Sequence, residues 1–569
     1  MPGSQDGPSW RVEARALMRL VVPICVQMGS QQLMVTTDLI FLGRLGRFPL
    51  AVGTLASTLF NLLWFGIAGF GTAFDTLGSQ AHGAGDALAV RNWAALAAAS
   101  LSACCVPAAA VLLCGKFLAS WVLSQDAATA DAVGTFCAVL LLGLWPAALT
   151  LVLQKYLQVR NVVVPVAATS LITFGINVGA NWFFIKTCGM GTAGSALATT
   201  ASRFVNLALL FEYVRRTPKE YEALLDPDRR GGSSIARHTS RVDSEDTLGA
   251  LTERLSFEEA PAAFADDVDT TRAPERRQNT RRGSGASSFA AACRDARAGV
   301  DARMVAEMTK LGWRGAVMVA AEASSFDVTV VFASQLSQVA LDAHMAMMNV
   351  CALTFMTGPM AFGIAANVRV GNLLGSGDAA RAKLAATVAV AIGVTWMAAC
   401  AIAIVAGGDT VGEVFVGTGD RDVVATVARI APYAAVFQVA DGVLGTANGV
   451  LRAAGKQSEL AVVNVVALWG GGVTVGALCT FALGAGVVGL WIGLALGVSG
   501  GAVWLGRAQA LMDWQAEARA ARANAALGGG DAREGDGDGD DERAALVAVA
   551  GGDGDEDVSD GDLTASGSS

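Results

Sequence analysis

Apolar stretches of about 20 residues recur along this chain, and they constrain its fold more than any other feature. Each is long enough to cross about 30 Å of hydrocarbon as an α-helix. One such stretch could be the core helix of a water-soluble protein, but a long series of them cannot share one core. The predicted spans are 17–43, 50–79, 93–115, 132–154, 165–187, 191–214, 311–335, 339–367, 384–406, 424–451, 459–483 and 486–508. The second and eighth are long enough to be bent.

Charged residues are scarce except in two segments. Of the 569 residues, 53% are hydrophobic and 16% are charged, whereas a typical soluble domain has about 25% charged residues. Charged and small polar residues gather between the sixth and seventh spans and after the last one, a composition typical of disorder. The sequence therefore predicts a cytoplasmic tail (1–16), a six-helix N-lobe (17–214), a disordered cytoplasmic linker (215–305), a six-helix C-lobe (306–508) and a disordered acidic cytoplasmic tail (509–569).

Several classes of function are excluded by what the sequence lacks. No basic stripe is interleaved with aromatic residues, so nucleic acid is not an expected partner. The ten cysteines form no Cys-x-x-Cys pair, which argues against a zinc site and a disulfide framework. No metal-binding cluster, Ser/His pair or phosphate-binding loop with a Lys-Ser/Thr ending is present. We therefore expect no enzyme, no metal, no cofactor and no ATP-driven transport. Because the first fifteen residues are polar, we expect no cleaved signal peptide.

The short loops predict an orientation in the membrane. If both termini are cytoplasmic, the inner loops hold most of the basic residues, as the positive-inside rule requires. These residues are Arg91, Lys155, Arg160, Arg369, Arg381, Lys383, Arg452 and Lys456. Arg44 and Arg47 lie on the outer side, so the rule holds on balance. The sequence does not distinguish the plasma membrane from the vacuolar membrane.

The two halves of the chain resemble each other at a nearly constant offset. A Gly-x-Gly-Asp turn occurs in both halves, 292 residues apart. The matched positions are Asp86 and Asp378, Arg160 and Arg452, and, at an offset of 295, Gly191 and Gly486. Because each half has an even number of spans, both halves cross the membrane in the same sense. We therefore predict an all-α polytopic membrane protein, with twelve transmembrane helices in two pseudo-symmetric six-helix bundles around a central cleft.

Ionisable residues within the spans are the candidates for function, because each costs on the order of 3 kcal/mol to insert. They are Asp38, Asp75, Arg203, Glu322, Asp327 and Asp441. A buried carboxylate can hold a proton or a cation but rarely both, and that competition is sufficient for exchange. Structural alternatives remain: Asp441 could bond to Asn448, Asp75 could be purely structural, and Arg203 could neutralise a carboxylate or contact an anion.

Glu322 and Asp327 lie on the same predicted helix, five residues apart. Five residues correspond to about 140° of rotation on an ideal helix. The two carboxylates therefore cannot face one spot unless the helix is kinked or unwound.

Three segments carry recognisable motifs: Gly-Phe-Gly-Thr-Ala-Phe-Asp-Thr-Leu-Gly-Ser-Gln-Ala-His-Gly from Gly69, Ala-Val-Met-Val-Ala-Ala-Glu-Ala-Ser-Ser-Phe-Asp from Ala316, and Gly358-Pro359 followed by Ala-Asn-Val-Arg-Val-Gly-Asn from Ala366. Together these segments resemble the multidrug and toxic compound extrusion (MATE) family, specifically its eukaryotic, plant-like branch. The resemblance covers 17–508 without the linker and implies two lobes of six helices.

The resemblance also implies roles for single residues. Glu322, Asp327 and Asp441 match family acids implicated in proton coupling and cation binding. Asp38 matches the first-helix acid of prokaryotic members, which leaves sodium coupling open. Asn349 stands where animal members often have a glutamate.

The aromatic residues of the family motif are missing from the seventh span. Ala323 and Ser324 replace tryptophans that are usual in eukaryotic members. Aromatic contacts expected for flat organic cations are therefore absent at these two positions.

The expected function is a secondary active antiporter that exports small organic solutes by alternating access. Organic cations or xenobiotics in exchange for protons are the favoured interpretation. The alternatives are a citrate-like organic-acid or flavonoid exporter that uses Arg203, and a sodium-coupled variant. A monomer is expected, and a lipid flippase would need more basic residues within the membrane than Arg203 alone.

Overall fold

The computed structural model describes residues 9–122, 126–216, 301–416 and 420–529, which fold into helices joined by turns. Nearly all of the predicted linker, 215–305, lies outside the described residues. The first half contains α1 (Trp10–Leu45), α2 (Arg47–Phe70), α3 (Thr72–Gly83), α4 (Ala87–Leu113), α5 (Gly115–Phe117), η1 (Leu118–Val122), α6 (Ala127–Leu142), α7 (Leu144–Val159), α8 (Val164–Asn181), η2 (Trp182–Thr187) and α9 (Gly191–Arg216). The segments labelled η are π-helical.

The second half repeats this pattern of long helices. It contains α13 (Ala302–Ser334), α14 (Gln338–Thr357), α15 (Pro359–Ser376), α16 (Ala379–Ala406), α17 (Gly408–Val416), α18 (Arg421–Ala453), α19 (Gln457–Val463), η5 (Asn464–Thr474), α20 (Val475–Ala477), η6 (Leu478–Ala482), α21 (Val487–Leu511) and α22 (Trp514–Gly529). The two long spans predicted to be bent are interrupted, at Gly71 between α2 and α3 and at Gly358 between α14 and α15.

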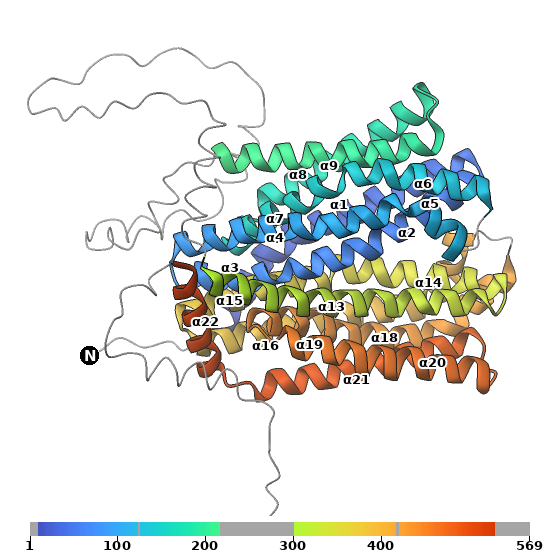
Figure 1. The fold of residues 1–569 in the computed structure, drawn as a ribbon. Helices are drawn as coiled ribbons and strands as arrows, with labels where there is room; N and C mark the ends of the chain where they lie inside the picture. Colours follow the sequence, from blue (N-terminus) through green and yellow to red (C-terminus); the bar gives the residue numbers. More distant parts are fainter. Residues whose placement is uncertain (1–8, 123–125, 217–300, 417–419, 530–569) are drawn as a thin grey trace, which may run out of the picture. The chain divides into compact units, whose positions relative to one another are not determined.

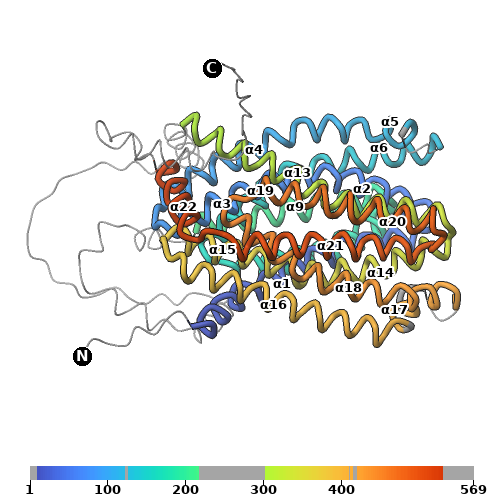
Figure 2. The backbone as a smooth tube through the Cα atoms, turned by 90° about the horizontal axis from the view of Figure 1, so that it is seen from below, coloured from blue at the N-terminus to red at the C-terminus, as the bar shows by residue number. Residues whose placement is uncertain are grey.

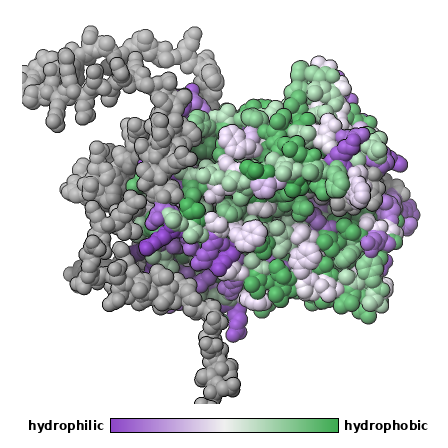
Figure 3. Space-filling view, in the orientation of Figure 1, coloured by the Kyte–Doolittle hydropathy of each residue, from purple (hydrophilic) through white to green (hydrophobic). Residues whose placement is uncertain are grey.

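The helices of each half lie side by side and form a lobe. Figure 1 shows the helices of the first half, blue to green, on one side of the bundle and those of the second half, yellow to red, on the other. Figure 2 shows the same long helices from a second direction, with α22 lying across one end. We call α1–α9 the N-lobe, α13–α21 the C-lobe, and the end crossed by α22 the α22 end. Apolar side chains cover much of the length of the bundle and polar ones gather toward its ends (Figure 3).

Most of the long helices are apolar enough to cross a bilayer. Within the described residues nine spans meet that test, or ten when α6 and α7, bent by 42°, are counted as one. The two remaining spans of a twelve-helix fold are α1 and α9. Polar residues lower the hydropathy of both helices, among them Asp38 on α1 and Thr199 and Arg203 on α9. α1 and α9 are therefore less apolar than the other helices of the fold that are long enough to span a membrane.

The internal repeat is visible in the backbone. Asp86 and Asp378 each cap a helix by accepting a hydrogen bond from the backbone N–H three residues later. The glycines just before them share a left-handed conformation, with φ 81° at Gly85 and 82° at Gly377. Further left-handed pairs, 295 residues apart, are Gly189 with Gly484 and Gly191 with Gly486. Because side chains other than glycine rarely adopt this conformation, the matched turns explain why the glycine motifs occur in both halves.

Each lobe contributes one helix to the other lobe near the α22 end. The first turns of α13 pack into the N-lobe, where Met304, Met308 and Leu311 join the main apolar cluster. The first half of α1 packs into the C-lobe, where Leu17 and Ile24 are buried with residues of α15 and α16. This reciprocal packing joins the lobes at that end.

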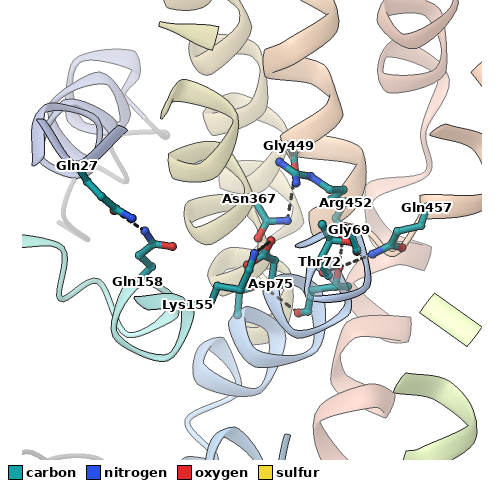
Figure 4. A network of polar contacts seen from close by, with 12 residues as sticks. Gln27, Gly69, Thr72, Asp75, Lys155, Gln158, Asn367, Gly449, Arg452 and Gln457 are labelled. Carbon is teal, nitrogen blue, oxygen red and sulfur yellow. Dashed lines mark hydrogen bonds and ion pairs between the residues drawn. The ribbon is translucent and has the colours of Figure 1, made fainter. Parts of the chain in front are cut away.

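A network of buried hydrogen bonds joins α3 of the N-lobe to α18 and α19 of the C-lobe (Figure 4). Thr76 Oγ1 donates to the carbonyl oxygen of Arg452 at 2.6 Å and accepts from Gln457 Nε2 at 2.8 Å. Gln80 Nε2 donates to the carbonyl oxygen of Ala453 at 2.8 Å. Among the described residues, the side-chain hydrogen bonds between the lobes lie in the α22 half of the bundle or near its middle. The lobes are thus held together at the α22 end.

Helix α22 contacts both lobes. Trp514 and Ala521 belong to the apolar cluster of α15 and α16, and Ala525 belongs to the N-lobe cluster. Farther along the helix, Asn92 Nδ2 of the N-lobe donates to the carbonyl oxygen of Gly528 at 3.0 Å. The helix therefore spans the boundary between the lobes.

The prediction that all of 509–569 is disordered is wrong for 509–529, which form the end of α21 and all of α22. The charges of this segment favour disorder, but its small residues have the spacing of a helix face. Trp514, Ala518, Ala521 and Ala525 recur every three to four residues and form the buried face of an amphipathic helix. The residues from 530 onward lie outside the described part of the chain.

Glu13 fixes the start of α1 to the C-lobe. Its carboxylate is 1% exposed and accepts hydrogen bonds from Arg369 Nε and Arg381 Nε, both at 2.9 Å. Glu13 precedes the first predicted span. Burial alone would raise the pKa of Glu13, but the hydrogen bonds and charges of the two arginines outweigh it and the pKa lies below its ordinary value.

Replacing Glu13 with Gln is expected to lower the free energy of unfolding by about 2 kcal/mol at pH 7. Since the folded pKa of Glu13 is depressed, its contribution is complete above the unfolded pKa of about 4.3 and is lost as the pH falls through the folded value. The difference between wild type and Glu13→Gln in thermal unfolding should therefore shrink below about pH 4.3. Glu307→Gln, which removes a carboxylate 3.7 Å from Lys310, is the matched control. A difference that stays constant down to pH 3 would contradict the assignment.

Candidate functional site

Glu322 lies in α13 and faces the start of η5. Asn464 Nδ2 donates to Glu322 Oε2 at 3.2 Å and to the carbonyl oxygen of Met318 at 3.1 Å. The Arg452 side chain acts on Glu322 electrostatically, although the described structure records no ion pair between them. With one hydrogen bond recorded to it, the carboxylate keeps room for a proton or a ligand.

Asp441 lies in α18 and is 4% exposed. It interacts electrostatically with Glu322, and within the described residues it has no hydrogen-bond or ion-pair partner. The bond to Asn448 that the sequence left open is not formed, and Asn448 Oδ1 has no partner either. A buried carboxylate without a partner is strongly disfavoured as a lone charge in a low-dielectric interior. Asp441 and Glu322 are therefore two interacting carboxylates inside the C-lobe.

Asp327 and Asn349 stand apart from this pair. Asp327 is exposed and has no hydrogen-bond or ion-pair partner among the described residues. Asn349 is also exposed, and its Nδ2 donates to the carbonyl oxygen of Met345 one turn earlier. Because α13 is one unbroken helix from Ala302 to Ser334, Asp327 does not share the face of Glu322. Glu322 thus interacts electrostatically with Asp441, and no such interaction is recorded for Asp327.

An aromatic side chain reaches α13 from another helix. Trp469 of η5 donates from Nε1 to the carbonyl oxygen of Ala321 at 2.9 Å. The sequence lacks tryptophans at Ala323 and Ser324, the next positions of α13. Trp469 therefore places an indole ring next to the segment of α13 that has no tryptophan at Ala323 and Ser324.

Asp38 lies in a polar pocket of the N-lobe. Asn181 Nδ2 donates to Asp38 Oδ1 and Thr199 Oγ1 donates to Asp38 Oδ2, both at 2.6 Å. Asn181 also donates to the side chain of Asn177 at 3.2 Å. In contrast to Asp441, the carboxylate of Asp38 is therefore held by donors on both oxygens.

Arg203 points into the same lobe. Its guanidinium carbon lies 4.1 Å from the centre of the Phe60 ring, and its Nη1 is buried without a hydrogen-bond partner. Arg203 and Asp38 act on each other electrostatically. Arg203 follows Thr199 by one helical turn, so both lie on the face of α9 that is turned to Asp38.

Asp75 forms an ion pair with Lys155, and the two side chains are 13% and 12% exposed (Figure 4). The Nζ–Oδ2 distance is 2.5 Å. With its carboxylate already paired, Asp75 has less capacity for a further cation than Asp441. The geometry fits the structural role that the sequence left open for Asp75.

Several residues of these sites are not among those that the sequence predicts. The sequence predicts an inner loop at Lys155, and it predicts no site role for Asn181, Thr199, Asn464 or Trp469. One available signal was the presence of polar residues inside apolar spans, such as the Asn177 and Asn181 pair at i and i+4. Within the described residues no group of three His, Cys, Asp or Glu side chains is placed to hold a metal ion.

A family model covers more than half of the chain. The MatE model matches residues 23–183 and 316–478, one segment in each lobe. The chain belongs to the MATE family. The two matched segments start near the beginning of α1 and within α13, which agrees with the internal repeat.

Relatives from animals and plants match almost the whole chain. Multidrug and toxin extrusion protein 2 of Mus musculus is 29% identical over 86% of this chain and 73% of its own length. Protein DETOXIFICATION 12 of Arabidopsis thaliana is 24% identical over 92% of this chain and 94% of its own length. The crystal structure of the eukaryotic MATE transporter AtDTX14 matches with a TM-score of 0.71 and 21% identity, over 91% of this chain and 99% of that one.

These comparisons confirm the predicted family and the predicted fold of helices in two bundles. As a MATE protein the chain is an integral membrane transporter of small organic solutes and not an enzyme. The coupling ion, the class of solute, the membrane and the roles of single residues are predictions that the comparisons leave open.

Proposed function

We propose that this MATE protein exports small organic cations in exchange for protons, with Glu322 and Asp441 as the exchange site. The observation that carries the proposal is the state of Asp441, which is buried without a hydrogen-bond or ion-pair partner among the described residues and lies within electrostatic range of Glu322. Two nearby carboxylates in a low-dielectric interior favour binding of positive charge, either as protons or as part of a cationic solute.

The exchange follows from competition for the same oxygens. When Glu322 and Asp441 are ionised they attract an organic cation, and when they are protonated that attraction is removed. Trp469 hydrogen-bonds the carbonyl oxygen of Ala321, next to Glu322 in the chain, and supplies an aromatic face for such a solute. A proton gradient can then drive solute transport, because the two ligands exclude each other.

The inter-lobe contacts support alternating access. The recorded side-chain hydrogen bonds between the lobes gather toward the α22 end, so this conformation is closed there. With both termini on the cytoplasmic side, as the positive-inside rule favours, the α22 end is the cytoplasmic end. Opening that end requires Thr76 and Gln80 to release the C-lobe.

Uptake by liposomes that contain the purified full-length protein tests this proposal. A labelled organic cation should accumulate against its gradient when a proton gradient of the correct sign is imposed, and should not accumulate when the gradient is dissipated by a protonophore. Liposomes without protein are the control. Uptake that follows a sodium gradient and ignores the proton gradient would replace the proton with sodium in the proposal.

The competing function is export of organic acids or flavonoids with Arg203 as the anion contact. Arg203 Nη1 is buried and lacks a hydrogen-bond partner, which is the observation in its favour. Its stacking on Phe60 inside the N-lobe and its proximity to Asp38 argue against it. Loss of anion export in Arg203→Lys would support this function, and unchanged cation export in the same variant would weigh against it.

A further inference from the structure

The pocket around Asp38 raises the question of whether the N-lobe can bind a coupling cation. Hard cations such as sodium take oxygen ligands, and the pocket holds oxygens of Asp38, Asn177, Asn181 and Thr199. Asn181 Oδ1 is buried and has no hydrogen-bond partner. By the chemistry of its donor set alone, the pocket fits a sodium ion.

The positive charge of Arg203 disfavours a sodium ion in this pocket. Asp38 and Arg203 interact electrostatically, and Arg203 lies one turn beyond Thr199, which hydrogen-bonds Asp38. With Asp38 ionised and Arg203 protonated, the pocket is already neutral. A sodium ion would give it a net positive charge inside a membrane protein, where such a charge is poorly solvated.

Because Arg203 follows Thr199 by one helical turn, its positive charge opposes the binding of a second cation at Asp38. Lys155 and Asp75 do not change the net charge around Asp38 and Arg203, because they form an ion pair with each other.

Arg203 is also fixed in place. Its guanidinium lies on the face of Phe60, which in turn stacks on Trp64 with ring centres 6.2 Å apart. Asp38 is held by hydrogen bonds from two different helices, α8 and α9. Neither side chain is free to leave the pocket without losing these contacts.

We propose that Arg203 is the built-in counter-ion of Asp38 and excludes sodium from the N-lobe, so that Asp38 does not bind a coupling cation. The proposal deepens the proposed function and rests on it in one respect, because it leaves cation exchange to the C-lobe. There, Glu322 interacts electrostatically with both Arg452 and Asp441, so two carboxylates share one neighbouring arginine and their summed charge is negative when both are ionised.

Sodium binding to the purified full-length protein tests this without any transported solute. The midpoint of thermal unfolding in detergent is measured in sodium chloride and in potassium chloride of equal ionic strength. Wild type should give the same midpoint in both salts. Arg203→Met should gain a sodium-dependent rise that Arg203→Met/Asp38→Asn lacks, because a ligand that binds the native state stabilises it. Arg203→Lys, which keeps the charge, should behave as wild type.

Two results would overturn the proposal. One is a sodium-dependent rise in the wild-type midpoint that Asp38→Asn abolishes. The other is a folded Arg203→Met protein that gains no sodium dependence. If Arg203→Met does not fold, radioactive sodium binding to wild type, Asp38→Asn and Arg203→Gln decides in the same way. Because no transport is measured, failure of the proton–cation exchange would not affect the outcome.

Discussion

Glu322→Gln and Asp441→Asn are each expected to abolish proton-driven uptake of an organic cation. Each change removes one negative charge and keeps the shape of the side chain. In Glu322→Gln the new amide oxygen can still accept the hydrogen bond that Asn464 Nδ2 gives to the carboxylate at 3.2 Å. A unit charge lost at about 4 Å from a bound cation weakens its binding at least a hundredfold at an effective dielectric constant of about 20. Uptake should therefore fall to the level of liposomes without protein.

Two further substitutions show whether the loss of proton-driven uptake is specific to Glu322 and Asp441. Asp342→Asn removes a C-lobe carboxylate whose recorded partner is Gln338, and it should transport like wild type. Asp327→Asn should weaken solute binding less than Glu322→Gln does, because Asp327 has no recorded interaction with either member of the pair. Proton-driven uptake that persists in both Glu322→Gln and Asp441→Asn would show that coupling occurs elsewhere.

Glu322 and Asp441 can each be predicted from the sequence, but their interaction and their neighbouring residues cannot. Glu322 and Asp441 could be identified because a carboxylate in an apolar span is costly wherever it lies. Glu322 and Asp441 are more than one hundred residues apart in the chain, so their electrostatic interaction depends on the tertiary fold of the C-lobe, which no local pattern encodes. Asn464 and Trp469 lie on a third helix, and their contacts with α13 likewise arise only in the folded C-lobe.

The spans and the repeat could be predicted because they are local properties. Hydropathy marks a span within one window, and left-handed turns require glycine at fixed positions such as Gly85 and Gly377. Helix α22 was missed since its buried face consists mostly of alanine, which raises hydropathy little. Its helical spacing was the available signal, but only contact with both lobes shows that this face is buried.

Three glycines set how closely the lobes approach at the α22 end. A methyl group added at Gly371 of α15 would collide with Ser79 Oγ of α3, one at Gly375 with the Gln80 carbonyl, and one at Gly83 with the Asn372 carbonyl. These contacts join the N-lobe to the C-lobe next to the hydrogen bonds of Thr76 and Gln80. At Gly375 and Gly83 an added methyl group would meet the backbone of the other lobe, and at Gly371 it would lie 2.7 Å from Cβ of Ser79, which cannot rotate away.

Gly371→Val is therefore expected to hold the α22 end open and to abolish transport while each lobe stays folded. Overpacking costs about 2 kcal/mol, which shifts the closing equilibrium roughly thirtyfold toward the open state. Hydrogen–deuterium exchange should rise in α3 and α15, where the inter-lobe contacts are lost, and stay unchanged in α21. Gly500→Val is the matched control, because a methyl group there meets nothing within 4 Å. Wild-type uptake by Gly371→Val would mean that the lobes do not need this contact, and the closed α22 end would then not be an obligatory state of the cycle.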